Sequence, residues 1–383
     1  MPTEMQQSQT KVAPAHVQPS SKTRLSSLDV FRGITIAAMI LVNDPGDGHH
    51  VYWPLDHAQW NGCTPTDLVF PFFLFIVGVS MTLSFDSRRG KGANRGDLMR
   101  HTAKRSAIIF LLGIFIYAYP RFDVHTTRIL GVLQRIALVY IVTSALLLYT
   151  GRTVRTVTLI VILLGYCLLL TTVPVPGYGA GVLTMDGSLA TYIDSSLLSN
   201  HLYSPHRFDP EGLLSTIPAI ATCLIGVMVG EWIGKKSGTA LIFSLLKGSV
   251  AGISLGLIWN FWFPINKKLW TSSYVLFTAG AAMATFAVCY WLIDVLGWRK
   301  WAIPFVWFGV NPLTIYFSSE FLSQVLIHHS LGGVRLKNIA YENVFGHVFR
   351  SPYNNSLLFA GTYLCLFALV AWLMYQKKIL IRV

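Results

Sequence analysis

The sequence predicts an all-α membrane protein, a polytopic bundle of about ten transmembrane helices. Of its 383 residues, 53% are hydrophobic and only 12% are charged, roughly half the charged share of an average soluble domain. Ten stretches are long and apolar enough, or nearly so, to cross the roughly 30 Å hydrocarbon core of a bilayer. This composition excludes a disordered chain and disfavours a water-soluble globule.

The ten predicted spans follow one another along the chain. They cover residues 28–43, 66–85, 103–119, 129–149, 155–174, 213–233, 240–263, 273–296, 302–328 and 356–376. Residues 1–24 are polar and lack the apolar core of a signal peptide. We therefore expect a disordered cytoplasmic tail at 1–24 and a membrane domain at 25–383. Four of the five cysteines lie in apolar runs, which predicts small buried side chains rather than disulfides or a zinc site.

The distribution of basic residues predicts the topology. With a cytoplasmic N-terminus, 19 of the 30 Lys and Arg residues fall in inside segments, 8 in outside segments and 3 within spans. The positive-inside rule then favours both termini in the cytoplasm. Most of the net charge of +13 is thereby explained by topology, so we expect a lipid bilayer as partner and no nucleic acid.

Glycine spacing predicts close helix packing. Two runs of glycine at every fourth position lie in the sixth and seventh spans, at Gly226, Gly230 and Gly234 and at Gly248, Gly252 and Gly256. Such stripes let helix backbones approach closely in lipid. No internal repeat is visible, which disfavours an inverted-repeat transporter.

Two acidic motifs precede predicted spans on the outer side. The segment 64–67, Thr-Pro-Thr-Asp, has the form of a helix start, so Asp67 is expected as a capping residue. Asp67 also follows His57 by ten residues and is equally suited to orient its imidazole, and the two roles are compatible. The segment 209–211, Asp-Pro-Glu, repeats the pattern, and here a helix cap is favoured.

Charged residues inside spans are costly and are therefore candidates for function. Asp29 and Arg32 are spaced to pair on one helix face, either as an interfacial ion pair or as part of a site. Arg135 has no acid three or four residues away, so it needs a carboxylate, a phosphate or carbonyls from elsewhere. Glu320 is the candidate partner.

His57 is the sharpest candidate for chemistry, in a loop flanked by Trp53 and Trp60. Asn311 precedes a helix-bending proline and either satisfies the freed backbone or lines a cavity. Eight polar residues map to the outer half or the middle of the bundle and predict a cavity there: Asn43, His57, Asp67, Gln134, Arg135, Asn260, Asn311 and Glu320. Neither metal-ligand spacing nor a glycine-rich nucleotide loop is visible.

Several motifs resemble the heparan-α-glucosaminide N-acetyltransferase family, and the chain looks most like its shorter bacterial members. The motifs are Arg-Leu-Ser-Ser-Leu-Asp-Val-Phe-Arg-Gly at 24–33, Asn43, His-Ala-Gln-Trp-Asn-Gly at 57–62, Thr-Asp-Leu-Val-Phe-Pro at 66–71, Gly-Val-Leu-Gln-Arg-Ile at 131–136, Asp-Pro-Glu-Gly at 209–212 and Asn-Lys-Lys-Leu-Trp-Thr at 266–271. They run through nearly the whole chain beyond the tail, and the blocks at 57–62 and 66–71 are together quite specific.

The resemblance implies a transmembrane acyltransferase domain at 25–383 that moves acetyl from cytoplasmic acetyl-CoA to the amine of a terminal glucosamine. It also implies an inner-membrane location, and by analogy alone a homodimer. His57 occupies the position of the family's active-site histidine and Asn43 that of a neighbouring asparagine. Two departures bear on the glycan acceptor: we expect no counterpart here of the lumenal domain and extra leading helix of the lysosomal members, and Asp56 stands where they have a basic residue before the histidine.

Two chemical routes remain open for His57. It either deprotonates the amine of the sugar or accepts the acetyl group itself. Asn43 is expected to donate to the tetrahedral oxyanion, and Asp67 to hold the imidazole tautomer. Residues expected to bind acetyl-CoA are Arg135, Gln134, Asn311, Arg32, Arg88 and Arg89. Residues expected to bind the amino sugar are Trp60, Asn61, Glu320 and Asn260.

Two other functions compete with acetyl transfer. A transporter of amino sugars or short chitin-type oligosaccharides needs a site open alternately to both faces and no acetyl donor. A structural scaffold predicts no pocket around His57.

Overall fold

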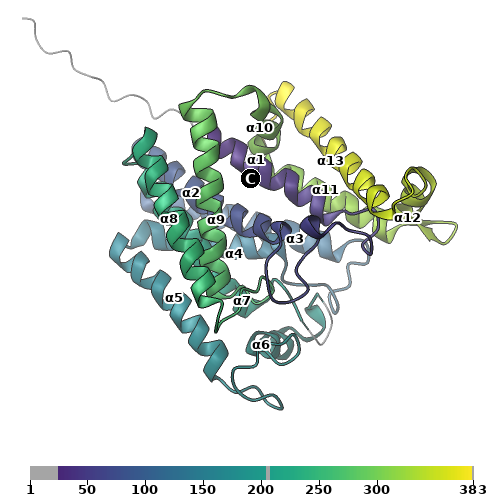
Figure 1. The fold of residues 1–383 in the computed structure, drawn as a ribbon, viewed down its shortest axis with the longest axis horizontal. Helices are drawn as coiled ribbons and strands as arrows, with labels where there is room; N and C mark the ends of the chain where they lie inside the picture. Colours follow the sequence, from purple (N-terminus) through teal and green to yellow (C-terminus); the bar gives the residue numbers. More distant parts are fainter. Residues whose placement is uncertain (1–24, 204–207, 382–383) are drawn as a thin grey trace, which may run out of the picture.

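A computed structural model describes residues 25–203 and 208–381, so the predicted tail at 1–24 lies outside the described residues. The longer elements are α1 (Ser26–Asn43), α2 (Val69–Arg89), α3 (Arg95–Ala118), α4 (Val132–Tyr149), α5 (Arg152–Thr172), α6 (Leu189–Leu198), α7 (Leu213–Ile233), α8 (Gly238–Trp259), α9 (Ser272–Tyr290), α10 (Ile303–Val310), α11 (Pro312–His328), α12 (Leu336–Ala340) and α13 (Pro352–Gln376) (Figure 1). Short turns are η1 (Trp53–Leu55), η2 (Pro65–Leu68), η3 (Ser199–His201), η4 (Trp291–Val295), η5 (Lys300–Ala302) and η6 (Tyr341–Phe345). A small antiparallel hairpin pairs β1 (Ser330–Leu331) with β2 (Val334–Arg335).

The all-α membrane bundle predicted from the sequence is confirmed. Within the described ranges, nine helices are long and apolar enough to cross a membrane, and they match nine of the ten predicted spans. The remaining span, 302–328, is split at Asn311 into α10 and α11, because Pro312 cannot donate a backbone hydrogen bond. The Asn311 side chain fastens the C-terminal segment instead: it donates to the Ile379 carbonyl (2.8 Å) and accepts from the Ile381 N–H (3.0 Å).

The glycine stripes do pack closely, but not against each other. An added Cβ at Gly226 would lie 2.1 Å from the Phe75 carbonyl oxygen of α2. An added Cβ at Gly252 would lie 2.9 Å from the Leu276 carbonyl oxygen of α9. The main helix pairs are accordingly α2 with α7 and α8 with α9, whereas α7 and α8 share few contacts.

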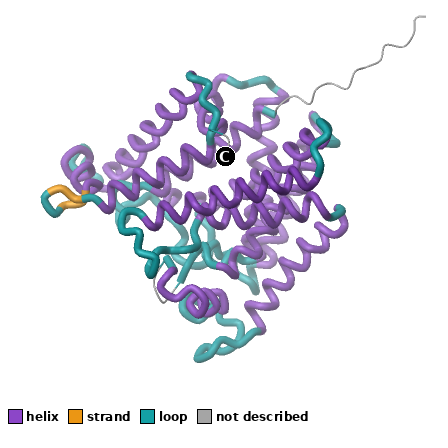
Figure 2. The backbone as a smooth tube through the Cα atoms, turned by 180° about the vertical axis from the view of Figure 1, so that it is seen from behind, coloured by secondary structure: helices purple, strands orange, loops and turns teal. Residues whose placement is uncertain are grey.

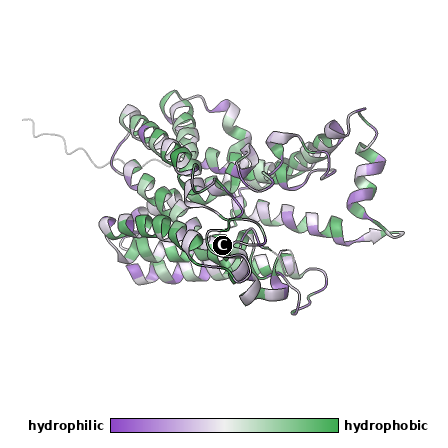
Figure 3. Ribbon diagram, turned by 60° about the horizontal axis from the view of Figure 1, so that its bottom comes forward, coloured by the Kyte–Doolittle hydropathy of each residue, from purple (hydrophilic) through white to green (hydrophobic). Residues whose placement is uncertain are grey.

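The peripheral helices expose apolar side chains, as expected for an integral membrane protein. On α5 these include Val161, Leu164 and Leu168, each more than half exposed. Hydrophobic residues run along most of the helices, and hydrophilic ones collect near their ends and in loops (Figure 3). An apolar surface of this extent is covered by lipid.

The longer loops gather beside α6, on one side of the bundle (Figure 2). The predicted topology places this side outside the cytoplasm. His57 and its neighbours lie in these loops, so the fold brings together chain segments about 200 residues apart.

Candidate active site

The pairing of His57 with Asp67 is the centre of the outer site. His57 Nδ1 lies 2.7 Å from Asp67 Oδ1. Because a carboxylate only accepts hydrogen bonds, Nδ1 carries the proton and Nε2 presents its lone pair. Asp67 Oδ2 accepts from the N–H groups of Ala58 (3.0 Å) and Thr64 (3.1 Å) and from the Thr64 hydroxyl (3.1 Å). Asp67 thus caps η2 and holds the imidazole at once, so the two predicted contacts coexist.

Lys267, from the loop between α8 and α9, completes this cluster. Its Nζ lies 3.5 Å from Asp67 Oδ1, 3.0 Å from His57 Nδ1 and 3.4 Å from His57 Nε2. Burial lowers the pKa of Lys267, and the Asp67 carboxylate opposes that shift. The side chain of His57 is 44% exposed, that of Lys267 17% and that of Asp67 1%. The imidazole is therefore the group of the three that a substrate reaches most readily.

The 260–271 loop is joined to the His57 loop by direct hydrogen bonds. The Gly62 N–H donates to the Ile265 carbonyl (2.8 Å), and the Asn266 amide donates to Asn61 Oδ1 (3.1 Å). Asn260 Oδ1 accepts from the Ile265 N–H (2.8 Å) at the end of α8. Asn61 and Asn260 are expected from the sequence to bind the acceptor; in this structure Asn61 joins the two loops, and Asn260 stabilises the 260–271 loop from within.

Trp60 has a similar bracing contact. Its indole N–H donates to the Leu183 carbonyl (2.7 Å), and its ring packs edge-on against Phe208 with the centroids 5.4 Å apart. The half-buried indole joins the His57 loop to the segment before α6. Trp60 thus anchors the loop that carries the imidazole to the segments around Leu183 and Phe208.

Asn43 contacts Glu320 and not His57. The Asn43 amide donates to Glu320 Oε1 (2.9 Å), which joins the outer end of α1 to α11. The next residue, Asp44, is buried, and burial raises its pKa to about 6 against the lowering effects of Ser323 and Lys337. The outer end of α1 thus carries its own polar cluster.

The expected pairing of Arg135 with Glu320 is wrong for the part of the chain that is described. Arg135 is fully buried, donates to the Gly212 carbonyl (3.3 Å) and to the Ser215 hydroxyl, and lies over the Trp270 ring at 4.9 Å from its centroid. Glu320 instead bonds Asn43, because α11 faces α1 and α3 whereas Arg135 faces the start of α7 and the loop before α9.

Arg128 is a buried anchor that the sequence did not reveal. Its guanidinium donates to both carboxylate oxygens of Asp209 (3.0 and 2.6 Å), to Glu211 (2.6 Å) and to the Tyr117 hydroxyl (3.2 Å), and it lies over the ring of Tyr203. Such a bidentate pair fixes geometry as well as charge. Arg128 therefore holds the segment before α7 in place.

The predicted cap of α7 at 209–211 is wrong. No side chain of that segment caps the helix, whose first N–H group at Leu213 donates to Asp194 Oδ1 (2.8 Å) from α6. Asp209 is engaged by Arg128 instead. The carboxylate of Asp194 takes the place of the local cap because Gly212 has no side chain: an added Cβ there would lie 1.7 Å from Asp194 Oδ2.

A cavity of about 380 Å³ opens at the other end of the bundle, which is predicted to face the cytoplasm. Of the six residues expected to bind acetyl-CoA, Arg32, Arg88 and Asn311 line it, and Gln134, Arg135 and Arg89 do not. Its remaining lining residues include Phe73, Val77, Ser80, Met81, Ser84, His101, Arg105, Ile109, Ile136, Tyr140, Val310, Pro312, Leu313 and Ile381.

Some of the charge in this cavity is already paired and some is not. Arg32 bonds Asp29 (3.1 Å), as expected from their spacing, together with the Gly309 carbonyl and the Ser80 hydroxyl. Arg105 Nε is buried with no hydrogen-bond partner in the described part of the protein. A buried guanidinium N–H without a partner is costly and suits an anionic ligand.

The eight outer polar residues do not share one cavity among those described. Asn311 lines the large inner cavity, and Gln134 and Glu320 line a cavity of about 10 Å³ between α3, α4 and α11. The Gln134 amide is buried and has no hydrogen-bond partner in the residues described. The polar groups therefore form separate clusters on different helices.

Comparisons with known proteins identify the family of this chain. The family model described as "Heparan-alpha-glucosaminide N-acetyltransferase, catalytic" matches residues 24–255. The chain is similar to the heparan-alpha-glucosaminide N-acetyltransferase of Homo sapiens, with 32% identity in an alignment that covers 93% of this chain and 59% of the human protein. Similarity to the Mus musculus protein is 31% over 360 residues, covering 79% of this chain and 54% of the mouse protein.

The chain spans somewhat more than half the length of the curated relatives it matches. The matched region contains His57, Asp67, Arg128 and the helices that line most of the inner cavity. By the extent of the family match and the identity over nearly its whole length, this chain belongs to the heparan-α-glucosaminide N-acetyltransferase family.

Proposed function

We propose that this protein is a transmembrane acetyltransferase that takes acetyl-CoA from the cytoplasmic side and acetylates the amine of an extracytoplasmic, glucosamine-type sugar. One observation carries the proposal: an Asp67-held imidazole lies at one end of the bundle and a basic cavity opens at the other. The names of its relatives support the reaction class. An inner-membrane location with both termini in the cytoplasm belongs to the same proposal.

The inner cavity fits the donor chemically. Arg88, His101 and Arg105 provide donors for phosphate groups, and the deeper wall is apolar, which suits the pantetheine arm. Its volume of about 380 Å³ lies at the lower end of the range for ligand pockets. The cavity therefore holds part of the donor and leaves the rest at its mouth.

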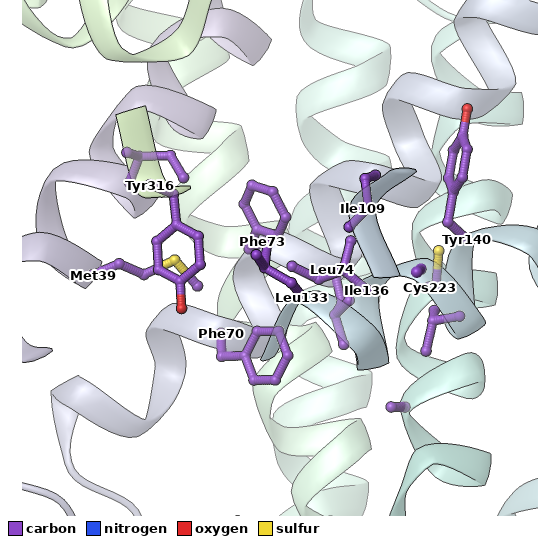
Figure 4. Packing of buried hydrophobic residues seen from close by; sticks show 14 of the residues in the cluster. Met39, Phe70, Phe73, Leu74, Ile109, Leu133, Ile136, Tyr140, Cys223 and Tyr316 are labelled. Carbon is purple, nitrogen blue, oxygen red and sulfur yellow. The ribbon is translucent and has the colours of Figure 1, made fainter. Parts of the chain in front are cut away.

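The interface between α3, α4 and α11, here called the seam, leads from this cavity toward the outer end of the bundle. On α4, Tyr140 and Ile136 line the large cavity, and Leu133 lines the small one about two turns further out. On α11 a shorter step of about one turn runs from Leu313, which lines the large cavity, to Tyr316, which lines the small one. The side chains of this seam lie between the two tyrosines (Figure 4). We propose that the acetyl-bearing arm follows this seam toward Asn43.

The reaction requires one proton to move at the outer end. As the amine nitrogen forms its bond to the acetyl carbon and the carbon–sulfur bond breaks, the amine loses a proton and the departing thiolate gains one. His57 Nε2 has the free lone pair that accepts the proton, or in the covalent route the acetyl group. Asp67 binds the Nδ1–H and so fixes the tautomer in which Nε2 carries the lone pair, and Asn43 is the proposed oxyanion donor.

The test is acetyl transfer across a sealed membrane. Purified protein in liposomes is given labelled acetyl-CoA on one face and glucosamine on the other, and labelled N-acetylglucosamine is measured. We expect product only when donor and acceptor are both present. Movement of unmodified glucosamine without acetyl-CoA would establish a transporter instead. A label that remains on His57 in the absence of acceptor would select the covalent route over direct transfer.

A further inference from the structure

Lys267 lies against the pair formed by His57 and Asp67, and neither the proton transfer nor the acetyl transfer described above involves it. Its ammonium is within 3.5 Å of Asp67 Oδ1 and of both ring nitrogens of His57. Nδ1 already donates to Asp67, so the ammonium finds no lone pair on that nitrogen, and its 3.4 Å separation from Nε2 is long for a hydrogen bond. Its attractive contact is the ion pair with Asp67, and it faces the imidazole as a nearby positive charge.

The fold holds Lys267 in this position. The 266–271 segment is tied internally, since Asn266 Oδ1 accepts from the Leu269 N–H (2.8 Å) and the Asn266 N–H donates to the Thr271 hydroxyl (3.0 Å). The neighbouring Lys268 takes a different direction, donating to the Gln59 carbonyl (2.6 Å). Two adjacent lysines thus have distinct partners, and only Lys267 contacts the pair.

We infer that Lys267 is a positioning residue. Its ammonium partly neutralises the Asp67 carboxylate, which disfavours the protonated form of His57 and so makes the imidazole release the proton that it takes up. This inference rests on the proposed function. With Asp67 negative and Lys267 positive, a neutral imidazole leaves the cluster uncharged. Protonating His57 adds a second cation beside one carboxylate, which is unfavourable in a partly buried site. The imidazole then accepts the amine proton briefly and passes it on to the thiolate.

The other charged groups around this cluster leave that argument intact. Asp56 is exposed and accepts from the His57 N–H (2.8 Å). The half-buried Lys268 donates to the Gln59 carbonyl and acts on Asp67 without an ion-pair contact. Glu211, which also acts on Lys267, is paired with Arg128. Burial raises the pKa of the Cys63 thiol to about 12, so this neighbour stays neutral.

The experiment compares Lys267→Met and Lys267→Arg with Lys268→Met, the adjacent lysine. The pH dependence of kcat is measured for acetyl transfer, with a thermal melt of each variant. Removing the charge at Lys267 favours the protonated imidazole, so the acid limb of the profile should move up by about one pH unit and kcat below it should fall about tenfold. Lys267→Arg should restore the limb, and Lys268→Met should match the parent protein.

A second measurement does not depend on turnover. The ring-carbon resonance of His57 in protein labelled at histidine, assigned by its loss in His57→Gln, should titrate at higher pH in Lys267→Met. An unshifted resonance and an unshifted acid limb in a folded Lys267→Met protein would overturn the inference. If Lys267→Met does not fold, a Lys267→Arg limb displaced from that of the parent protein would also count against it. Absence of acetyl transfer by the parent protein would contradict the proposed function instead.

Discussion

The two ends of the bundle differ in how their polar groups are held. At the outer end, His57 and Lys267 come from loops and Asp67 from the short turn η2, and the three lie within 3.5 Å of one another. In the inner cavity, Arg88 and Arg105 come from helices and line the cavity, and the buried Arg105 Nε has no hydrogen-bond partner among the described residues. A reactive group needs one fixed geometry, whereas a phosphate site needs charge that is not already paired. The difference separates a place for chemistry from a place for binding the donor.

The largest expected effect lies at the outer end. His57→Ala should reduce acetyl transfer by about 10²–10⁴-fold, the usual contribution of a general base, without lowering thermal stability much. The same loop offers a matched control, because His50 pairs with Asp47 at 2.6 Å in similar fashion. His50→Ala should retain activity within about twofold of the parent protein. Equal losses in both variants would show that the loop, not the imidazole, matters.

At the inner end, two adjacent arginines test donor binding. Arg88 lines the cavity and Arg89 does not. Arg88→Leu should raise the KM for acetyl-CoA about tenfold, since one charge-assisted contact to phosphate is lost. Arg89→Leu should leave the KM unchanged. The measurement is initial rate against acetyl-CoA concentration at saturating glucosamine. Equal KM values for the two variants would contradict the proposal that acetyl-CoA binds in this cavity.

The sequence predicts features that depend on neighbouring residues better than contacts between distant residues. The spans follow from local apolar runs, and the break at Asn311 follows from the adjacent proline, because both depend on neighbouring residues. The contact of His57 with Asp67 is predictable from the sequence, because Asp67 follows His57 by only ten residues and lies at a recognisable helix start. The contact of Lys267 with His57 is not predictable in this way, because the two residues lie 210 positions apart and only the tertiary fold brings them together.

Ion pairs of charged residues show the same limit. The sequence matched Arg135 with Glu320 by depth alone, but which helix faces which is a property of the packed bundle. Asp209 looked like a helix cap until Arg128, 81 residues away, was seen to bind it. A local motif identifies a polar group, and the partner that determines its role comes from elsewhere.

The seam that connects the two ends can be tested by narrowing it. Gly113 of α3 borders the small cavity, and an added Cβ there would lie 2.5 Å from the Gln134 side chain. Gly113→Ala should lower kcat about fivefold, equivalent to roughly 1 kcal/mol of overpacking, with little change in the KM for acetyl-CoA. Gly165→Ala on α5, where an added Cβ meets nothing within 4 Å, is the control. A kcat equal to that of the control would argue that the arm takes another path.

The smallest effect is on stability and concerns the polar cluster at the outer end of α1. Burial raises the pKa of Asp44 to about 6, so the folded state favours its neutral form. The stability from that form is fully present below the unfolded pKa of about 4 and is lost as the pH rises through about 6.

Asp44→Asn keeps a neutral side chain at every pH, so it should melt at a higher temperature than the parent protein at pH 8 and at the same temperature near pH 4. Asp47→Asn should behave in the opposite way, because the hydrogen bond from His50 lowers the pKa of Asp47 and makes its charged form the stabilising one. Thermal melts of both variants at the two pH values check this. A lower melting temperature of Asp44→Asn than of the parent protein at pH 8 would mean that Lys337 stabilises the carboxylate more than burial destabilises it, and the cluster would then resemble the paired Asp67 of the reactive site.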